Sequence, residues 1–131
     1  MNDQSLTIGA YEESGRHVLE LTGELDLAGV PAFEAAARQL QELRPHELLV
    51  DISNVAFIDS SGVRAILSIK SSCESQGCEF SMTHAGDDDR VFELARLLDH
   101  LPFRHRRRQR FRREIELGPQ ARGPSREPAD G

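Results

Sequence analysis

The 131-residue sequence predicts one small α/β domain followed by a basic extension. Over the first hundred residues, stretches in which every second residue is apolar are separated by stretches in which every third or fourth residue is apolar. This pattern is typical of strands joined by helices. The charge is also divided, because residues 1–100 contain 7 basic and 18 acidic side chains (net −11), whereas residues 101–131 contain 9 and 4 (net +5). We therefore expect an acidic folded body with an arginine-rich segment behind it.

An antiparallel pair of strands is expected at the start of the chain. Apolar residues alternate over 6–10, polar residues over 12–16 indicate a turn, and the alternation resumes over 18–21. A first helix follows, because Pro31 suits a first helical turn and the next apolar residues have helical spacing. These are Phe33, Ala36, Ala37, Leu40 and Leu43. Pro45 ends this helix, and the nearly continuous apolar stretch 47–52 predicts a central strand covered on both faces.

A second helix is predicted from Ser60 to about Gln76, where Gly77 ends it. A short strand over 79–83 follows, and three aspartates at 87–89 begin a third expected helix. Its apolar stripe is Val91, Leu94, Ala95 and Leu98. Strands joined through helices lie parallel with right-handed crossovers. The expected fold is thus a sandwich, with a mixed, mostly parallel sheet of four to five strands faced by three to four helices.

Residues 57–62, Phe-Ile-Asp-Ser-Ser-Gly, are the most informative segment for function. Ser60 and Ser61 lie where the second helix begins and where its first backbone N–H groups lack partners within the helix. In a structural interpretation, one of these serines caps the helix by accepting an N–H. In a functional interpretation, the same free N–H groups and the helix dipole favour a phosphoryl group there. The residues alone leave both interpretations open.

Two motifs together give the sequence a family resemblance. Residues 21–26, Leu-Thr-Gly-Glu-Leu-Asp, a proline-started helix and then residues 49–62 resemble the STAS domains of anti-sigma factor antagonists over about residues 5–103. The resemblance implies that Ser60, with Ser61 as the weaker candidate, is phosphorylated by a partner that is both an anti-sigma factor and a serine kinase. It also implies that the unphosphorylated form binds this partner and releases a sigma factor in a stress response. A PP2C-type phosphatase would reverse the modification.

The resemblance further implies a partner-binding set around Ser60. Its members are Asp26, Asp59, Ser61, Gly62 and Arg64. Asp26 could equally cap the loop ahead of the first helix, and Gly62 would let the backbone approach the kinase. Arg64, one helical turn after Ser60, replaces the small residue of many members and could pair with a phosphate or remain a solvated charge. A STAS binding module without a phosphoswitch, in a signalling scaffold or a lipid-transport complex, remains the alternative.

The arginine-rich extension, taken as residues 104–117, is expected to act electrostatically. Its arginines are Arg104, Arg106, Arg107, Arg108, Arg110, Arg112 and Arg113. Contact with an acidic protein surface, including the domain itself, is favoured over nucleic acid, because short basic runs match nucleic-acid patterns by chance. Anionic lipid is a further candidate. Residues 118–131, rich in Pro and Gly, are expected to be a disordered tail, which leaves 1–103 as the domain.

Other function classes lack support in the sequence. No nucleophile elbow, Walker-type loop or metal-ligand spacing is present, and the five histidines are scattered, so neither an enzyme nor a cofactor is predicted. Asp51 is expected to satisfy backbone N–H groups, and Cys73 and Cys78 are expected to be reduced structural thiols. The start of the chain does not resemble a secretory signal, and no apolar run reaches the ~20 residues of a membrane span. We therefore expect a cytoplasmic protein.

Overall fold

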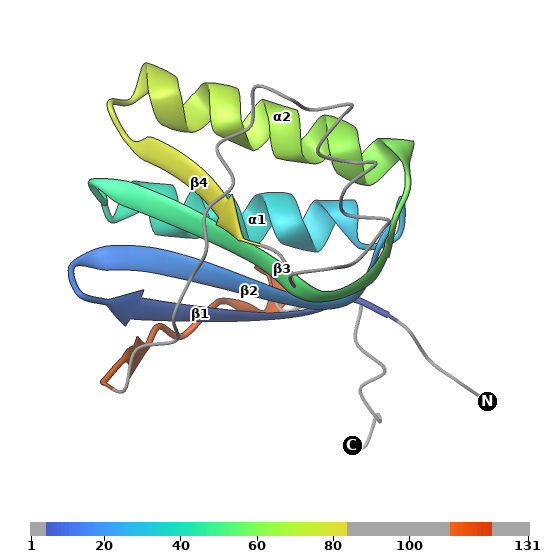
Figure 1. Cartoon of the computed structure of the whole chain (residues 1–131), viewed down its shortest axis with the longest axis horizontal. Helices are drawn as coiled ribbons and strands as arrows, with labels where there is room; N and C mark the ends of the chain where they lie inside the picture. Colours follow the sequence, from blue (N-terminus) through green and yellow to red (C-terminus); the bar gives the residue numbers. More distant parts are fainter. Residues whose placement is uncertain (1–4, 84–110, 122–131) are drawn as a thin grey trace.

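The structure of the protein, a computed structural model, describes residues 5–83 and 111–121 (Figure 1). The strands are β1 (Thr7–Glu13), β2 (Arg16–Leu25), β3 (Glu47–Ile58), β4 (Glu79–Thr83) and β5 (Arg113–Glu114). The helices are α1 (Val30–Glu42), α2 (Ser60–Ser75) and the short 3-10 helix η1 (Pro119–Ala121). The predicted third helix, over 87–98, lies outside these described residues.

The five strands form one mixed sheet in the order β4-β3-β2-β1-β5. Strands β2, β3 and β4 are parallel because α1 and α2 connect them, whereas β1 is antiparallel to both β2 and β5. A tight turn joins β1 to β2, and Ser14 and Gly15 have the positive φ angles, 50° and 82°, that such hairpin turns need. The predicted mixed α/β class is confirmed. The sheet was expected to be mostly parallel, but with β5 it has two parallel and two antiparallel strand pairs.

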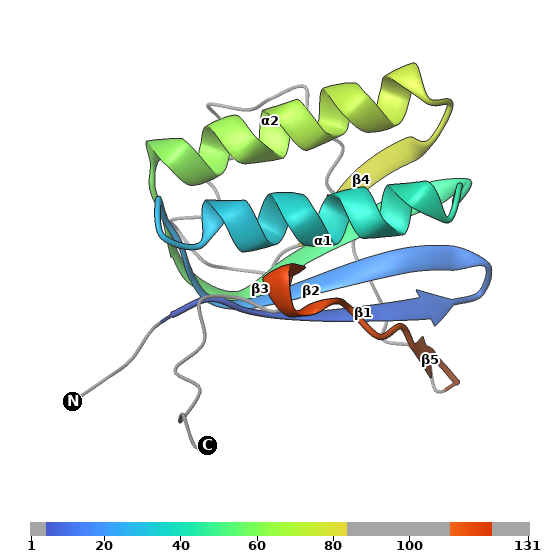
Figure 2. The ribbon, with the colours of Figure 1, turned by 180° about the vertical axis from the view of Figure 1, so that it is seen from behind.

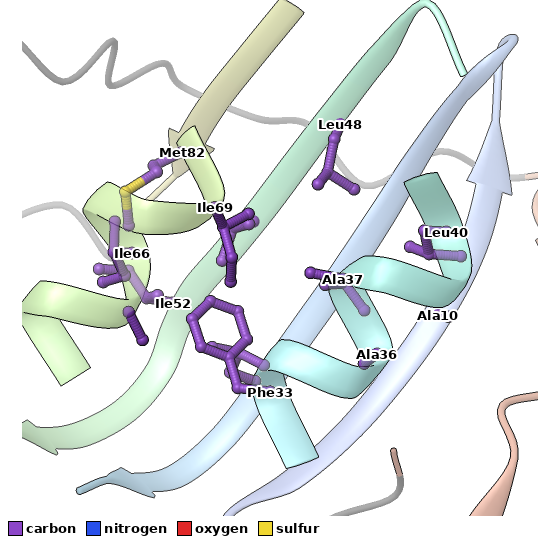
Figure 3. Packing of buried hydrophobic residues seen from close by; sticks show 14 of the residues in the cluster. Ala10, Phe33, Ala36, Ala37, Leu40, Leu48, Ile52, Ile66, Ile69 and Met82 are labelled. Atoms are coloured by element: carbon purple, nitrogen blue, oxygen red, sulfur yellow. The ribbon is translucent and has the colours of Figure 1, made fainter. Parts of the chain in front are cut away.

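Helices α1 and α2 lie side by side on one face of the sheet, as the two opposite views show (Figures 1 and 2). Figure 3 shows the side chains of Phe33, from α1, and Ile69, from α2, meeting above β3. Each buried side chain of this size stabilises the fold by about 1.5–3 kcal/mol. On the other face, Val18 and Leu49 are also fully buried, which confirms that the central strand is covered on both sides. Neither α1 nor α2 has the length and apolar character of a membrane-spanning helix.

Strands β2 and β3 extend further than their apolar patterns predict. Beyond Glu20 the two strands stay paired, through Thr22 opposite Asn54 to Leu25 opposite Ile58. Two register shifts interrupt this stretch, and such irregularities let polar residues continue a strand without an apolar alternation. The ends of the two strands therefore lie at the same edge of the sheet, and each carries one of the two sequence motifs.

The structure differs from the predicted C-terminal boundaries. Residues 113–114 pair with β1 as strand β5, and residues 119–121, which the composition assigned to a disordered tail, form η1. Leu117 and Ala121 are buried in the hydrophobic core, and the N–H of Gly118 donates to Oε1 of Gln39 on α1 at 3.0 Å. These contacts, together with the pairing of β5, place a segment whose Pro and Gly content indicated disorder on the folded domain.

Candidate functional site

The site is the amino end of α2, where the two sequence motifs meet. β3 ends at Ile58, and the N–H of Asp59 donates to the carbonyl oxygen of Leu25 at 3.3 Å. Leu25 is the last residue of β2 and belongs to the Gly-Glu-Leu-Asp motif. This hydrogen bond holds the start of the helix against the end of the neighbouring strand.

Asp59 caps α2, so the interpretation in which Ser60 or Ser61 is the cap is wrong. Asp59 has an extended backbone, and its Oδ1 accepts the N–H of Gly62 at 3.0 Å. Aspartate satisfies a helix start as well as serine does and adds a favourable charge at the positive end of the dipole. Ser60 is consequently the first helical residue, and its side chain is exposed, whereas Ser61 is half-buried.

Gly62 allows α2 to pack closely against the end of β2. A Cβ atom at this position would lie 2.5 Å from the carbonyl oxygen of Leu25 and 2.9 Å from Cγ2 of Ile58, well inside van der Waals contact. Only glycine lets the first turn of α2 approach the end of β2 this closely. Gly62 is buried, so the structure places it beneath the surface that was predicted to contact a partner.

The other two predicted aspartates bind backbone N–H groups. Oδ1 of Asp26 accepts the N–H of Gly29 at 3.2 Å, and the carbonyl oxygen of Asp26 accepts the N–H of Val30 at 3.1 Å. Asp26 therefore stabilises the turn that leads into α1, which is the structural alternative to partner binding given for it above. Oδ1 of Asp51 accepts the N–H of Ser53 at 2.9 Å, as predicted, although Asp51 lies within β3 and not at its end.

Two exposed apolar side chains flank the amino end of α2, and sequence reasoning missed both. Leu27, directly after Asp26, is 72% exposed, and Phe57, two residues before Asp59, is 46% exposed. Their backbones lie at the same edge of the sheet, because Glu24 is the register partner of Phe57. Exposed apolar side chains grouped around polar residues are typical of protein interfaces. Neither residue stands out in the sequence, because Phe57 lies among the apolar residues Val55, Ala56 and Ile58 of β3 and Leu27 precedes Ala28.

Charged side chains are distributed unevenly around this site. Arg64 is exposed, and the spacing of four residues places it on the helix face of Ser60. Arg112 and Arg113 are instead near the turn between β1 and β2, paired with glutamates of these strands, so the structure does not bring them to Ser60. They confirm that part of the extension folds back on the acidic body. Residues 104–110 lie outside the described ranges.

The site thus presents an exposed hydroxyl at a helix amino end, two apolar neighbours and one arginine. The hydroxyl of Ser60 lies at the positive end of the helix dipole and next to Asp59, and Arg64 follows one helical turn later. The described residues contain no group of three histidine, cysteine or acidic side chains able to hold a metal ion. The chemistry available here is surface recognition and acceptance of a group from outside.

Comparison with known proteins identifies relatives of this fold. The family model described as "Mlab, STAS domain" matches residues 9–100. The anti-sigma-F factor antagonist RsfB of Mycobacterium tuberculosis is 32% identical over 82 residues, which are 63% of this chain and 66% of RsfB, slightly less than two thirds of that relative.

Solved structures have the same fold. An anti-sigma factor antagonist from Mycobacterium paratuberculosis superposes with a TM-score of 0.67 at 24% identity, over 78% of this chain and 87% of that one. The anti-sigma factor antagonist SpoIIAA in its unphosphorylated form superposes with a TM-score of 0.60 at 15% identity, over 79% of this chain and 90% of that one. At these identities the two structures confirm the predicted fold.

Proposed function

The chain belongs to the STAS-domain family, and from this premise we propose that it is an anti-sigma factor antagonist switched by phosphorylation at Ser60. In its unphosphorylated form it binds an anti-sigma factor that is also a serine kinase, and a sigma factor is released. Relatives named as anti-sigma factor antagonists support this role.

One structural observation carries the proposal: Asp59, and not Ser60, caps α2. A capping serine commits its oxygen to a backbone N–H, and phosphorylation would then remove a hydrogen bond worth about 1 kcal/mol to the fold. Here the exposed hydroxyl of Ser60 is outside the cap, so a kinase can modify it while the helix start stays intact. The exposed Leu27 and Phe57 supply apolar contact area beside it.

The switch follows from charge and desolvation. A phosphoserine adds about −1.5 to −2 charges at neutral pH. Packing a partner against Leu27 and Phe57 would then remove water from this dianion beside the carboxylate of Asp59. The free energy needed for this desolvation exceeds the stabilisation from the apolar contacts. Phosphorylation therefore weakens partner binding, and a PP2C-type phosphatase restores it. The kinase brings nucleotide, magnesium and base, so the chain needs no catalytic group of its own.

The test is phosphate transfer to the purified full chain. Incubation with the candidate kinase and ATP should add one phosphate by intact mass, and Ser60→Ala should abolish the gain. Ser61→Ala is the matched control, because it removes the neighbouring hydroxyl and should still accept phosphate. No gain on the unchanged chain, or a gain that survives Ser60→Ala, contradicts the proposal.

A second candidate is a STAS binding module without a phosphoswitch. It is favoured by one observation, namely that the matching family model is described by the STAS domain of Mlab and not by antagonist activity. Pull-down of the partner with Ser60→Asp separates the two functions. A switched antagonist loses the partner, whereas a module that uses Ser60 only as a surface residue keeps it.

A further inference from the structure

Arg112 occupies a defined position on the sheet face opposite to the helices. Its Nη1 lies 2.7 Å from Oε2 of Glu20 and 3.5 Å from Oε2 of Glu13, and its Cζ lies 3.6 Å from the centroid of the Tyr11 ring. The side chain of Glu13 is completely buried, and that of Glu20 is 13% exposed. The guanidinium is therefore held by two carboxylates and an aromatic face, and both carboxylates are shielded from water.

The register of β1 and β2 places the three side chains that contact Arg112 together. Tyr11, Glu13 and Glu20 share one face because Tyr11 and Glu13 are two residues apart on β1 and Glu20 is the partner of Gly9. A Cβ on Gly9 would lie 3.1 Å from both Cε2 and the hydroxyl oxygen of Tyr11, so glycine gives the ring room to lie along the strand. Two closely placed, shielded carboxylates need a cation, and a planar guanidinium satisfies both and stacks on the ring.

Arg112 directly precedes strand β5, which lies at the edge of the sheet. β5 pairs with β1 through Tyr11 opposite Glu114, and the N–H of Ile115 donates to the carbonyl oxygen of Ala10 at 2.8 Å. Five residues after the arginine, Leu117 is buried in the core. An arginine on one face, backbone pairing at the edge and an apolar anchor further along are the components of peptide recognition by strand addition.

We propose that Tyr11, Glu13 and Glu20 form a peptide-binding site for an arginine on an extended segment, and that residues 111–121 of this chain are its resident ligand. The site recognises the guanidinium, and the edge of β1 together with the core residues around Leu117 recognise the rest of the segment. The contacts of this segment include the ion pairs of Arg112 and Arg113, the two-residue strand β5, the hydrogen bond from Gly118 to Gln39 and the buried side chains of Leu117 and Ala121. The same segment supplied in trans offers the same groups, so it competes with the resident one for these contacts.

The test uses a fluorescent peptide with the sequence of residues 111–121 and the full chain, with anisotropy as the readout. Arg112→Ala in the chain removes the guanidinium only from the resident strand, so this variant should bind the peptide at least ~10-fold more tightly than the unchanged chain does. Replacing the peptide's Arg112 by lysine should weaken binding at least ~10-fold, because an ammonium cannot bridge both carboxylates and stack. The matched peptide control replaces Arg113, which is 78% exposed, and should bind within ~3-fold.

Equal binding of the arginine and lysine peptides, or equal binding by the unchanged chain and the Arg112→Ala variant, overturns the proposal. If Arg112→Ala does not fold, hydrogen exchange of the full-length Arg112→Lys variant decides. Exchange of the Ile115 amide, which pairs with Ala10, should accelerate at least ~10-fold while amides in α1 stay protected. An unchanged rate at Ile115 contradicts a guanidinium-specific site.

Discussion

At the scale of single residues, neighbouring side chains of the Asp-Ser-Ser-Gly motif have separate tasks. Asp59 satisfies the helix start, Gly62 permits the close approach to Leu25, and Ser60 remains exposed. The sequence could not assign the cap, because Asp59, Ser60 and Ser61 are three successive residues that all cap helices well. Only the extended backbone of Asp59 decides among them.

Asp59→Ala should lower the free energy of unfolding by about 1 kcal/mol, within the 0.5–2 kcal/mol measured for lost helix caps. Ser60→Ala is its control and should change stability by less than about 0.5 kcal/mol, because an exposed side chain outside the cap is removed. Urea denaturation of both variants measures the difference. A larger loss for Ser60→Ala than for Asp59→Ala contradicts the assignment of the cap.

Gly62→Ala provides a test whose sign is informative. Helix propensity alone predicts a gain of about 1 kcal/mol for alanine over glycine within a helix. The new methyl group would instead meet the carbonyl oxygen of Leu25 at 2.5 Å, and such overpacking against backbone costs about 1–3 kcal/mol. We expect a lower melting temperature. A higher one would show that α2 does not press against the end of β2.

At the scale of elements, the apolar pattern predicted β1 to β4, α1 and α2, because the helices and most strands bury one regular face and β3 buries both. It could not predict β5, since a two-residue strand of sequence Arg-Glu has no periodicity and is specified by long-range contacts. The same reason explains the underestimated ends of β2 and β3, where backbone pairing replaces apolar alternation.

Leu117→Ala tests whether the C-terminal segment is part of the folded unit. Leu117 is 5% exposed within the core cluster, and truncation of a buried leucine costs about 2–5 kcal/mol. Leu43→Ala is the matched control, because this leucine is 55% exposed at the end of α1 and its loss should cost less than about 0.5 kcal/mol. Equal denaturation midpoints for the two variants would place Leu117 outside the core.

Two shielded thiols lie near the connection from α2 to β4, Cys73 within the end of α2 and Cys78 directly before β4. Burial raises the pKa of the Cys78 thiol to about 12 and also raises that of Cys73, which accepts a hydrogen bond from Nε2 of Gln41 at 3.4 Å. Because the thiolate is the reactive form, both cysteines should resist a thiol reagent at pH 8 in the folded chain and react fully in denaturant. Rapid modification of the folded protein would contradict their structural role.

At the scale of the whole molecule, the charge division along the sequence becomes a contact between its two parts. Arg112 and Arg113 pair with Glu13, Glu20 and Glu12, so part of the basic extension neutralises part of the acidic body. The composition showed that opposite charges exist in the two parts, but it could not show which side chains meet. Ser60 lies near the other end of β2, away from these ion pairs.

If the proposed switch operates, a phosphate on Ser60 controls the binding of the anti-sigma factor. Titration calorimetry of the anti-sigma factor with the unphosphorylated chain and with the chain phosphorylated at Ser60 measures this control. The proposed switch predicts that phosphorylation weakens the affinity at least ~100-fold, because a dianion must be desolvated beside Asp59 and the apolar contacts. Equal affinities for the two forms would contradict the switch and favour a STAS binding module without one.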